Sequence, residues 1–151
     1  MTESVEQQEL VAEWKRGEFL ISTDQQRLNI PFVHEFLSSQ SYWAKGRSRE
    51  LVERSIDNSL SFGVFHDNEQ IGFARVVTDY VTFAWLADVF IIDTYRGQGL
   101  GRWLVEMITS HPKLQGFRRW LLATRDAHEL YRQVGFRELA EPNRWMERRN
   151  D

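Results

Sequence analysis

Three glycines alternate with larger residues in the stretch RGQGLG, residues 96 to 101, and an amphipathic helical pattern follows at once. The start of a helix leaves backbone N–H groups unpaired, and the helix dipole adds positive potential there. Glycine has no Cβ, so a bulky anion can approach this backbone closely. We therefore expect an anion-binding loop, above all for phosphate. The alternative is a tight strand-to-helix turn without a ligand.

The rest of the chain predicts one α/β domain over residues 18–151, after a mobile N-terminal tail at residues 1–17. Changes between a period of two and a helical period mark the elements. Strands are expected at residues 17–23, 60–66, 70–77, 81–92, 118–124 and 144–148. Helices are expected at residues 29–40, 48–59, 126–136 and, after the glycines, up to Pro112. This order is typical of an antiparallel meander that leads into a β-α-β unit.

The amino-acid composition limits the kinds of partner that we expect the chain to bind. The 151 residues include 19 Lys and Arg against 22 Asp and Glu, and no basic block stands out, so we expect no nucleic acid partner. Apolar stretches fall short of the ~20 residues that a membrane span needs, and the acidic start MTESVEQQELVAEW is unlike a signal peptide. The absence of cysteine excludes disulfides and thiolate metal sites. We expect a cytoplasmic protein without a membrane partner.

The glycine loop does not match the common nucleotide-binding motifs. The pattern G-x-x-x-x-G-K-[ST] is absent, and G-x-G-x-x-G fails because its last position falls on Arg102 or Leu104. The loop does match Arg/Gln-x-x-Gly-x-Gly/Ala at Arg96, Gly99 and Gly101. At this point the chain resembles the GNAT superfamily of acyl-CoA-dependent N-acetyltransferases.

The resemblance extends beyond this motif. DVFIIDTYRGQGLGRWLV, residues 88–105, looks like the fourth strand, pyrophosphate loop and third helix of that family. LLATRDAHELYRQVGF, residues 121–136, looks like its fifth strand and fourth helix. With the order of elements, the resemblance covers most of residues 18 to 148. It implies a mixed, mostly antiparallel sheet of about six to seven strands flanked by about four helices, with the fourth and fifth strands splayed apart.

The resemblance also implies acetyl-CoA, or another acyl-CoA, as co-substrate. The pyrophosphate would bind the loop amides, and the pantetheine arm would lie between the splayed strands. The cofactor-binding residues implied in this way are Val89, Phe90, Ile91, Arg96, Gly97, Gln98, Gly99, Leu100, Gly101, Arg102 and Thr124. Thr124 stands where relatives often carry asparagine. A solvated surface is the alternative for both arginines.

Two residues are candidates for the proton transfers of acyl transfer. Tyr131 stands where many family members have the tyrosine that protonates the departing thiolate, the alternative being a core tyrosine. Asp88 interrupts an apolar strand, and a partly desolvated carboxylate there would act as a base or bind the amine. The alternative is a carboxylate bonded to backbone or to an arginine such as Arg75. The four histidines lack metal-ligand spacing, so no metal is expected.

The acceptor site is the part least defined by sequence. In the family, the region that matches SSQSYWAKGRS, residues 38–48, commonly builds the acceptor pocket. The candidate pocket residues are Tyr42, Trp43, Tyr80 and Trp85, which would otherwise close the core or a homodimer contact. Asp79, Asp88 and Asp126 would favour a cationic amine.

The sequence therefore predicts an N-acetyltransferase. Its acetyl group would pass from acetyl-CoA to a primary amine of a small molecule or peptide by direct attack in a ternary complex. The other hypothesis is a CoA-binding sensor or interaction module that has lost catalysis.

Overall fold

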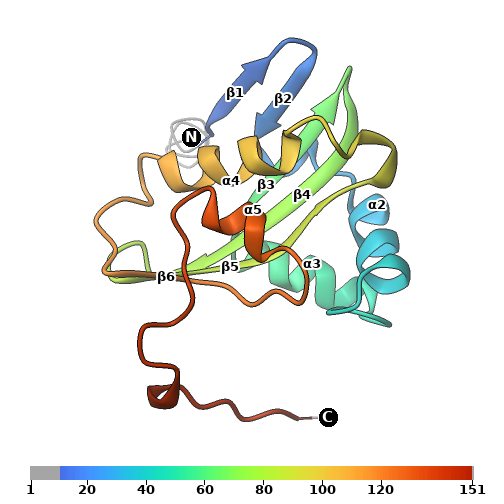
Figure 1. The fold of residues 1–151 in the computed structure, drawn as a ribbon. Coiled ribbons are helices and arrows are strands. Elements are labelled where there is room, and N and C mark those ends of the chain that lie inside the picture. Colours follow the sequence, from blue (N-terminus) through green and yellow to red (C-terminus); the bar gives the residue numbers. More distant parts are fainter. Residues whose placement is uncertain (1–10, 151) are drawn as a thin grey trace, which may run out of the picture.

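Six strands in the described residues, 11 to 150 of the computed structural model, form one sheet in the order β1-β2-β3-β4-β5-β6 (Figure 1). They are β1 (Glu13–Arg16), β2 (Phe19–Ser22), β3 (Leu60–His66), β4 (Glu69–Thr78), β5 (Phe83–Ile91) and β6 (Arg119–Leu121). Each strand up to β5 pairs antiparallel with its neighbour, whereas β6 is parallel to β5. The expected mixed, mostly antiparallel sheet is confirmed.

Helices cover both faces of this sheet (Figure 1). On one face, α4 (Leu100–Ser110) and α5 (His128–Arg132) pack over a core that includes Ile71, Leu86 and Leu104. On the other face, α2 (Ile30–Glu35) and α3 (Arg49–Asp57) pack over Phe73 and Phe90. The connection from β5 to β6 therefore crosses over through α4, as a parallel pair requires.

Local sequence signals explain where α2 and α3 begin. Asn29 and Ser48 each accept the backbone N–H of the residue three positions later, and Pro31 lies in the first turn of α2. The helix expected over residues 29–40 is interrupted at Phe36, where a π-helical turn, Phe36–Gln40, takes over. This turn closes when the N–H of Ser41 donates to the Phe36 carbonyl at 3.1 Å.

Two expectations at the chain ends need correction. The predicted tail, residues 1–17, is too long, because residues 13–16 form β1 and pair with β2; residues 1–10 lie outside the described residues. The strand expected at residues 144–148 is wrong. This segment follows a short 3-10 turn, η4 (Pro142–Arg144), and runs without a strand partner, with Met146 97% exposed (Figure 1).

β5 is irregular at two points that matter for the site. It pairs with β6 only from Phe83 to Trp85, so the rest of β5 has no β6 partner. β5 and β6 correspond to the fourth and fifth strands of the family, which were expected to splay apart. The pairing of β5 with β4 also shifts register between Ala87 and Phe90. One extra residue on β5 forms a bulge there, and Asp88 takes a positive φ of 55°.

None of the helices described here combines the length and the apolar character that a membrane crossing would need.

Candidate active site

The chain between β5 and α4 forms the predicted glycine loop. It passes through a 3-10 turn, η3 (Asp93–Tyr95), to Gly97 and Gly99, whose φ angles of 83° and 78° lie in the left-handed region that favours glycine. Gly99 is the N-cap of α4. In the part of the chain that the structure describes, the N–H groups of residues 97 to 102 donate to no backbone carbonyl. They form a row of donors that an anion can bind.

Two arginines of the loop region already have acidic partners. Arg96 forms an ion pair with Asp93 at 2.7 Å and donates to the Ile91 carbonyl at 3.1 Å. Arg102 donates to Glu106, one helical turn further on, at 2.7 Å. Both side chains are more than half exposed. The solvated surface that we kept as an alternative for these arginines is what the geometry favours.

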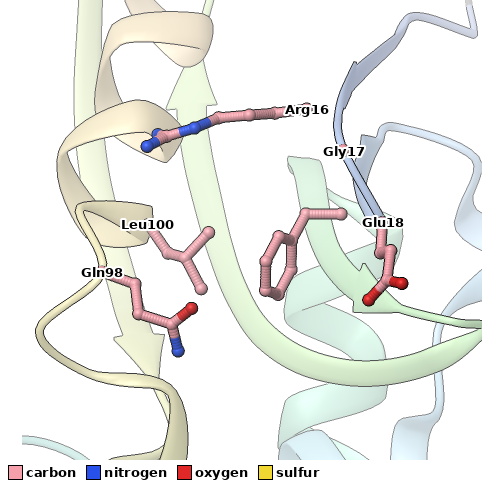
Figure 2. A pocket seen from close by; sticks show the side chains of 6 residues that line it. Arg16, Gly17, Glu18, Gln98 and Leu100 are labelled. Carbon is pink, nitrogen blue, oxygen red and sulfur yellow. The ribbon is translucent and has the colours of Figure 1, made fainter.

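A third arginine, Arg16 at the end of β1, lies beside the loop and was missed by sequence reasoning. Its Nη2 would be 3.8 Å from a Cβ placed on Gly99, and its guanidinium lies over the Trp103 ring at 5.8 Å. Among the described residues, no carboxylate lies within 4.0 Å of it. Figure 2 shows the side chain reaching from β1 toward the first turn of α4.

A cavity of about 240 Å³ lies between the β1–β2 turn and the glycine loop (Figure 2). It is lined by Arg16, Gly17, Glu18, Phe19, Gln98 and Leu100. Gln98 and Leu100, two of the predicted cofactor-binding residues, therefore face this cavity together with Arg16. Gly101 points the other way, since a Cβ there would meet Leu130 of α5 at 3.2 Å.

Tyr131 lies on α5, on the side of the molecule where β5 and β6 separate. Its side chain packs against Phe136 and the core and is 9% exposed as a residue, and its hydroxyl forms no hydrogen bond with any described residue. Burial, and secondly the nearby Tyr42, raise the pKa of Tyr131 to about 12. A cavity of about 480 Å³ beside it is also lined by Thr124, whose hydroxyl accepts the Ala127 N–H.

Asp88 is enclosed and bonded to three donors. Its side chain is 2% exposed. One carboxylate oxygen accepts from the Trp43 indole at 2.9 Å, and the other accepts from Arg47 at 2.9 Å and from Arg75 at 3.0 Å. The alternative that we left open, a carboxylate held by an arginine such as Arg75, is what the geometry favours over a free base.

The bulge explains how Asp88 reaches these partners. Regular alternation would direct Asp88 to the same face as Ala84 and Leu86, which lie in the core under α4. The extra residue reverses the alternation, so that the carboxylate meets Arg75 while Phe90 packs under α2 and α3.

The acceptor candidates Tyr42 and Trp43 lie beside this cluster. Their rings meet edge to face at 5.1 Å. The Tyr42 hydroxyl accepts the backbone N–H of Arg125 at 2.7 Å, and the Arg125 guanidinium stacks on the Tyr42 ring at 3.9 Å. The segment after α2 thus bridges to the connection between β6 and α5. Trp85 is 36% exposed and pairs with Val77 on the sheet face that carries Arg75.

The remaining predicted acceptor residues do not join this group. Asp79 and Tyr80 lie in the β4–β5 turn, at the opposite end of β5 from the glycine loop. The Thr82 hydroxyl, and then the N–H groups of Thr82 and Val81, hold the pKa of Asp79 well below its usual range. Asp126 lies 3.6 Å from the Arg125 guanidinium on the surface. Asp79 therefore lies away from the Asp88 cluster, and Asp126 already has a cation beside it.

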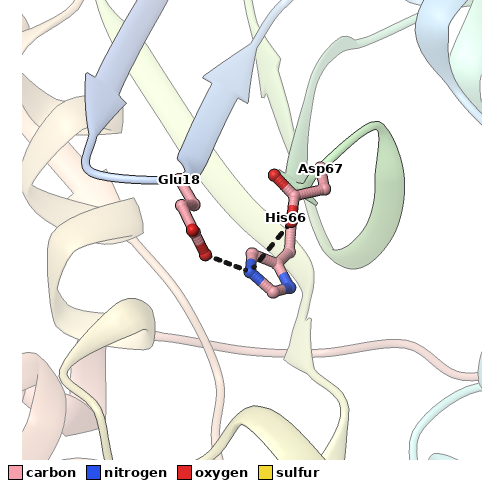
Figure 3. A group of neighbouring side chains, drawn as sticks. All are labelled: Glu18, His66 and Asp67. Carbon is pink, nitrogen blue, oxygen red and sulfur yellow. Dashed lines mark hydrogen bonds and ion pairs between the residues drawn. The ribbon is translucent and has the colours of Figure 1, made fainter.

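One group of described side chains has the donor types of a metal site. Glu18, His66 and Asp67 bring their ligand atoms within 4.8 Å of one another (Figure 3). His66 Nε2 lies 3.0 Å from Glu18, and its Nδ1 lies 2.7 Å from the Tyr95 hydroxyl. Both carboxylates are more than two-thirds exposed. The group links the two hairpin turns to η3 by hydrogen bonds from the His66 ring to Glu18 and Tyr95, and these contacts account for it.

Comparison with known proteins adds independent findings. A family model described as the acetyltransferase (GNAT) family matches residues 20–136. A candidate acetyltransferase of Gibberella zeae is 30% identical, over 85% of this chain and 84% of its own length. A crystal structure of a candidate GNAT acetyltransferase from Xanthomonas campestris pv. campestris is 45% identical and superposes with a TM-score of 0.86, over 90% of this chain and 96% of that one.

A more distant solved structure shares the fold. It is a GNAT family acetyltransferase from Elizabethkingia anophelis with acetyl-CoA bound. It is 17% identical and superposes with a TM-score of 0.62, over 81% of this chain and 78% of that one.

Proposed function

Because this chain belongs to the acetyltransferase (GNAT) family, we propose that it transfers an acetyl group from acetyl-CoA to a primary amine in a ternary complex. The observation that carries the proposal is the row of unpaired N–H groups at residues 97 to 102. Those donors lie at the start of α4, where β5 and β6 no longer pair. An acetyl-CoA complex of a structure with the same fold is consistent with this arrangement.

The carrier binds through its phosphates at the loop. The amides of residues 97 to 102 hold the pyrophosphate, and Arg16 adds a cation that no carboxylate of the described chain neutralises. The pantetheine arm lies along the unpaired part of β5, at Val89 to Ile91. An N–H of that stretch stabilises the negative charge that develops on the thioester oxygen.

Tyr131 is the proposed general acid. The amine nitrogen attacks the thioester carbon, and the tetrahedral intermediate expels the CoA thiolate, which takes the phenol proton. A pKa of about 12 keeps this phenol protonated at neutral pH. Its hydroxyl is free of hydrogen bonds to the described chain, so it can donate to sulfur.

Asp88 positions the site in this proposal and does not accept the amine proton. Its two oxygens already hold the Trp43 indole, Arg47 and Arg75. The proton of the ammonium group passes to water before attack. The attacking nitrogen then loses a second proton to water as the amide forms, and the Tyr131 phenolate takes a proton back from water. The same observation favours the second hypothesis, a CoA-binding module without catalysis, because it leaves the reaction without a dedicated base.

Calorimetric titration with acetyl-CoA and a thiol-release assay with an amine panel test the proposal. We expect saturable acetyl-CoA binding and amine-dependent thiol release. The variant Tyr131→Phe should bind acetyl-CoA as tightly as the wild type but turn over more slowly by a factor of about 100 or more, since general acid–base catalysis contributes roughly 10²–10⁴-fold. Equal turnover would remove Tyr131 from the mechanism. Binding without thiol release for any amine would support the non-catalytic module.

A further inference from the structure

The buried cluster around Asp88 has more positive than negative charge. Arg47 and Arg75 donate to the same carboxylate oxygen, and neither lies within ion-pair distance of another acid in the described residues. Two guanidinium groups therefore share one carboxylate, which leaves one positive charge in excess. The side chains of Arg47 and Arg75 are 24% and 14% exposed, so water compensates this charge only in part.

Most donors of the two guanidinium groups are unused. Arg47 uses one nitrogen for Asp88, and Arg75 uses Nε for Asp88 and Nη1 for Ser59. Their other nitrogens have no partner among the described residues. The enclosed polar side-chain atoms without a partner in that part of the chain are Ser61 Oγ and His111 Nε2, so each unused arginine nitrogen keeps some exposed surface. These N–H groups are the donors that an anion would use.

The cluster lies next to the segment of β5 that is proposed to hold the thioester. Asp88 directly precedes Val89 to Ile91, the stretch proposed to hold the thioester, so the two are within about 10 Å along the strand. The partly exposed rings of Tyr42, Trp43 and Trp85 lie on the same side of the sheet or contact the cluster. An amine that reaches the thioester from this side therefore passes the two arginines.

We infer that the acceptor amine carries an anionic group, a carboxylate or a phosphate, which Arg47 and Arg75 bind while the amine faces the thioester. This substrate class rests on the proposed acetyl transfer and replaces the cationic amine that the aspartates suggested from sequence. Asp88 fixes the two guanidinium groups in place and leaves their outer N–H groups for the substrate. The excess charge repels diamines and polyamines.

Matched pairs of amines test the inference. An α-amino acid is compared with its amide, and 2-aminoethyl phosphate with ethanolamine, by acetyl-CoA-dependent thiol release and by binding to the protein alone. We expect at least tenfold higher kcat/KM for one of the anionic members than for its neutral partner. The pair that shows the preference distinguishes carboxylate from phosphate.

Substitution of Arg47 gives the second readout. Arg47→Met should bring the ratio of kcat/KM between the anionic amine and its neutral partner to nearly one, whereas Arg47→Lys should retain part of the preference. Arg49→Met is the matched control, since Arg49 is exposed and paired with Glu53. It should keep the full preference.

Two results would overturn the inference: equal use of the charged and neutral amines by the wild type, or a preference that Arg47→Met leaves intact. Failure of acetyl-CoA binding would instead contradict the proposed function. In that case the binding of the anionic amines to the wild type and to Arg47→Met still decides whether the cluster is an anion site.

Discussion

Replacing Arg16 by methionine tests the proposed phosphate site at the one residue of it that the sequence did not predict. Methionine keeps an apolar stem over Trp103 but removes the charge. Arg16 is exposed, so its contact with a phosphate lies between a surface ion pair, about 0.2–1 kcal/mol, and a charged hydrogen bond in a more enclosed site, about 1.5–3 kcal/mol. We take about 1–2 kcal/mol, which corresponds to a rise of roughly 5- to 30-fold in the Kd of acetyl-CoA.

Calorimetry with two ligands separates a phosphate contact from a general effect on the cleft. Acetyl-CoA carries the pyrophosphate, whereas acetyl-pantetheine lacks it. We expect Arg16→Met to weaken acetyl-CoA binding and leave acetyl-pantetheine binding unchanged. The difference between wild type and variant should shrink at high salt, because an exposed charge is screened.

The adjacent Lys15 provides the matched control. Lys15→Met removes an exposed positive charge from the same strand, but alternation along β1 directs this side chain to the opposite face from Arg16. It should not change the Kd of acetyl-CoA. If Arg16→Met also has no effect, or if both ligands weaken equally, Arg16 does not bind phosphate.

Three further predictions follow from single contacts. Gly99→Ala places a side chain at φ 78°, at a cost of about 1–2 kcal/mol, and should lower the thermal midpoint and weaken acetyl-CoA binding in calorimetry. Asp88→Asn leaves two partly buried guanidinium groups without a carboxylate and should lower the free energy of unfolding in urea by about 2 kcal/mol; a loss below about 1 kcal/mol would contradict the cluster. Because the folded chain holds the Tyr131 proton to about pH 12 and the unfolded chain releases it near 10, stability should fall as pH rises between these values, and Tyr131→Phe should lose that part of the fall in alkaline denaturant melts.

The central and C-terminal parts of the fold were predictable because their signals are local. Strong alternation marks β3 and β4, and the apolar run of β5 leads directly into the glycines and the amphipathic face of α4. β1 has no such signal. Its four residues, EWKR, form a strand because Gly17 lets the chain turn back onto β2. The apparent strand at residues 144–148 has apolar residues but does not pair with the free edge of β6, although the Arg119 guanidinium of β6 lies over the Trp145 ring at 4.9 Å.

The candidate site likewise contains residues with a local sequence signal and residues that only the tertiary fold brings together. The loop donors and Tyr131 lie in short motifs, so the sequence alone proposes them as site residues. Arg16 reaches Gly99 only because the sheet order brings β1 over the start of α4, which no local pattern encodes. Only one of the three partners of Asp88 could be predicted from the sequence. Arg75 lies opposite Ala87 across the β4–β5 pair, but Trp43 and Arg47 come from an irregular segment whose path depends on tertiary packing.

The bulge at Asp88 connects the two halves of the proposed chemistry. A positive φ at a residue with a Cβ costs about 1–2 kcal/mol, and such strain persists only where the surroundings over-determine it. Here three donors to the enclosed Asp88 carboxylate hold the backbone in this strained conformation. The single extra residue turns Asp88 toward the arginines and leaves the following backbone at the open side of β5. The geometry proposed to hold the thioester and the charge proposed to select the acceptor therefore depend on the same irregularity, so a change that relaxes the bulge should alter carrier binding and acceptor preference together.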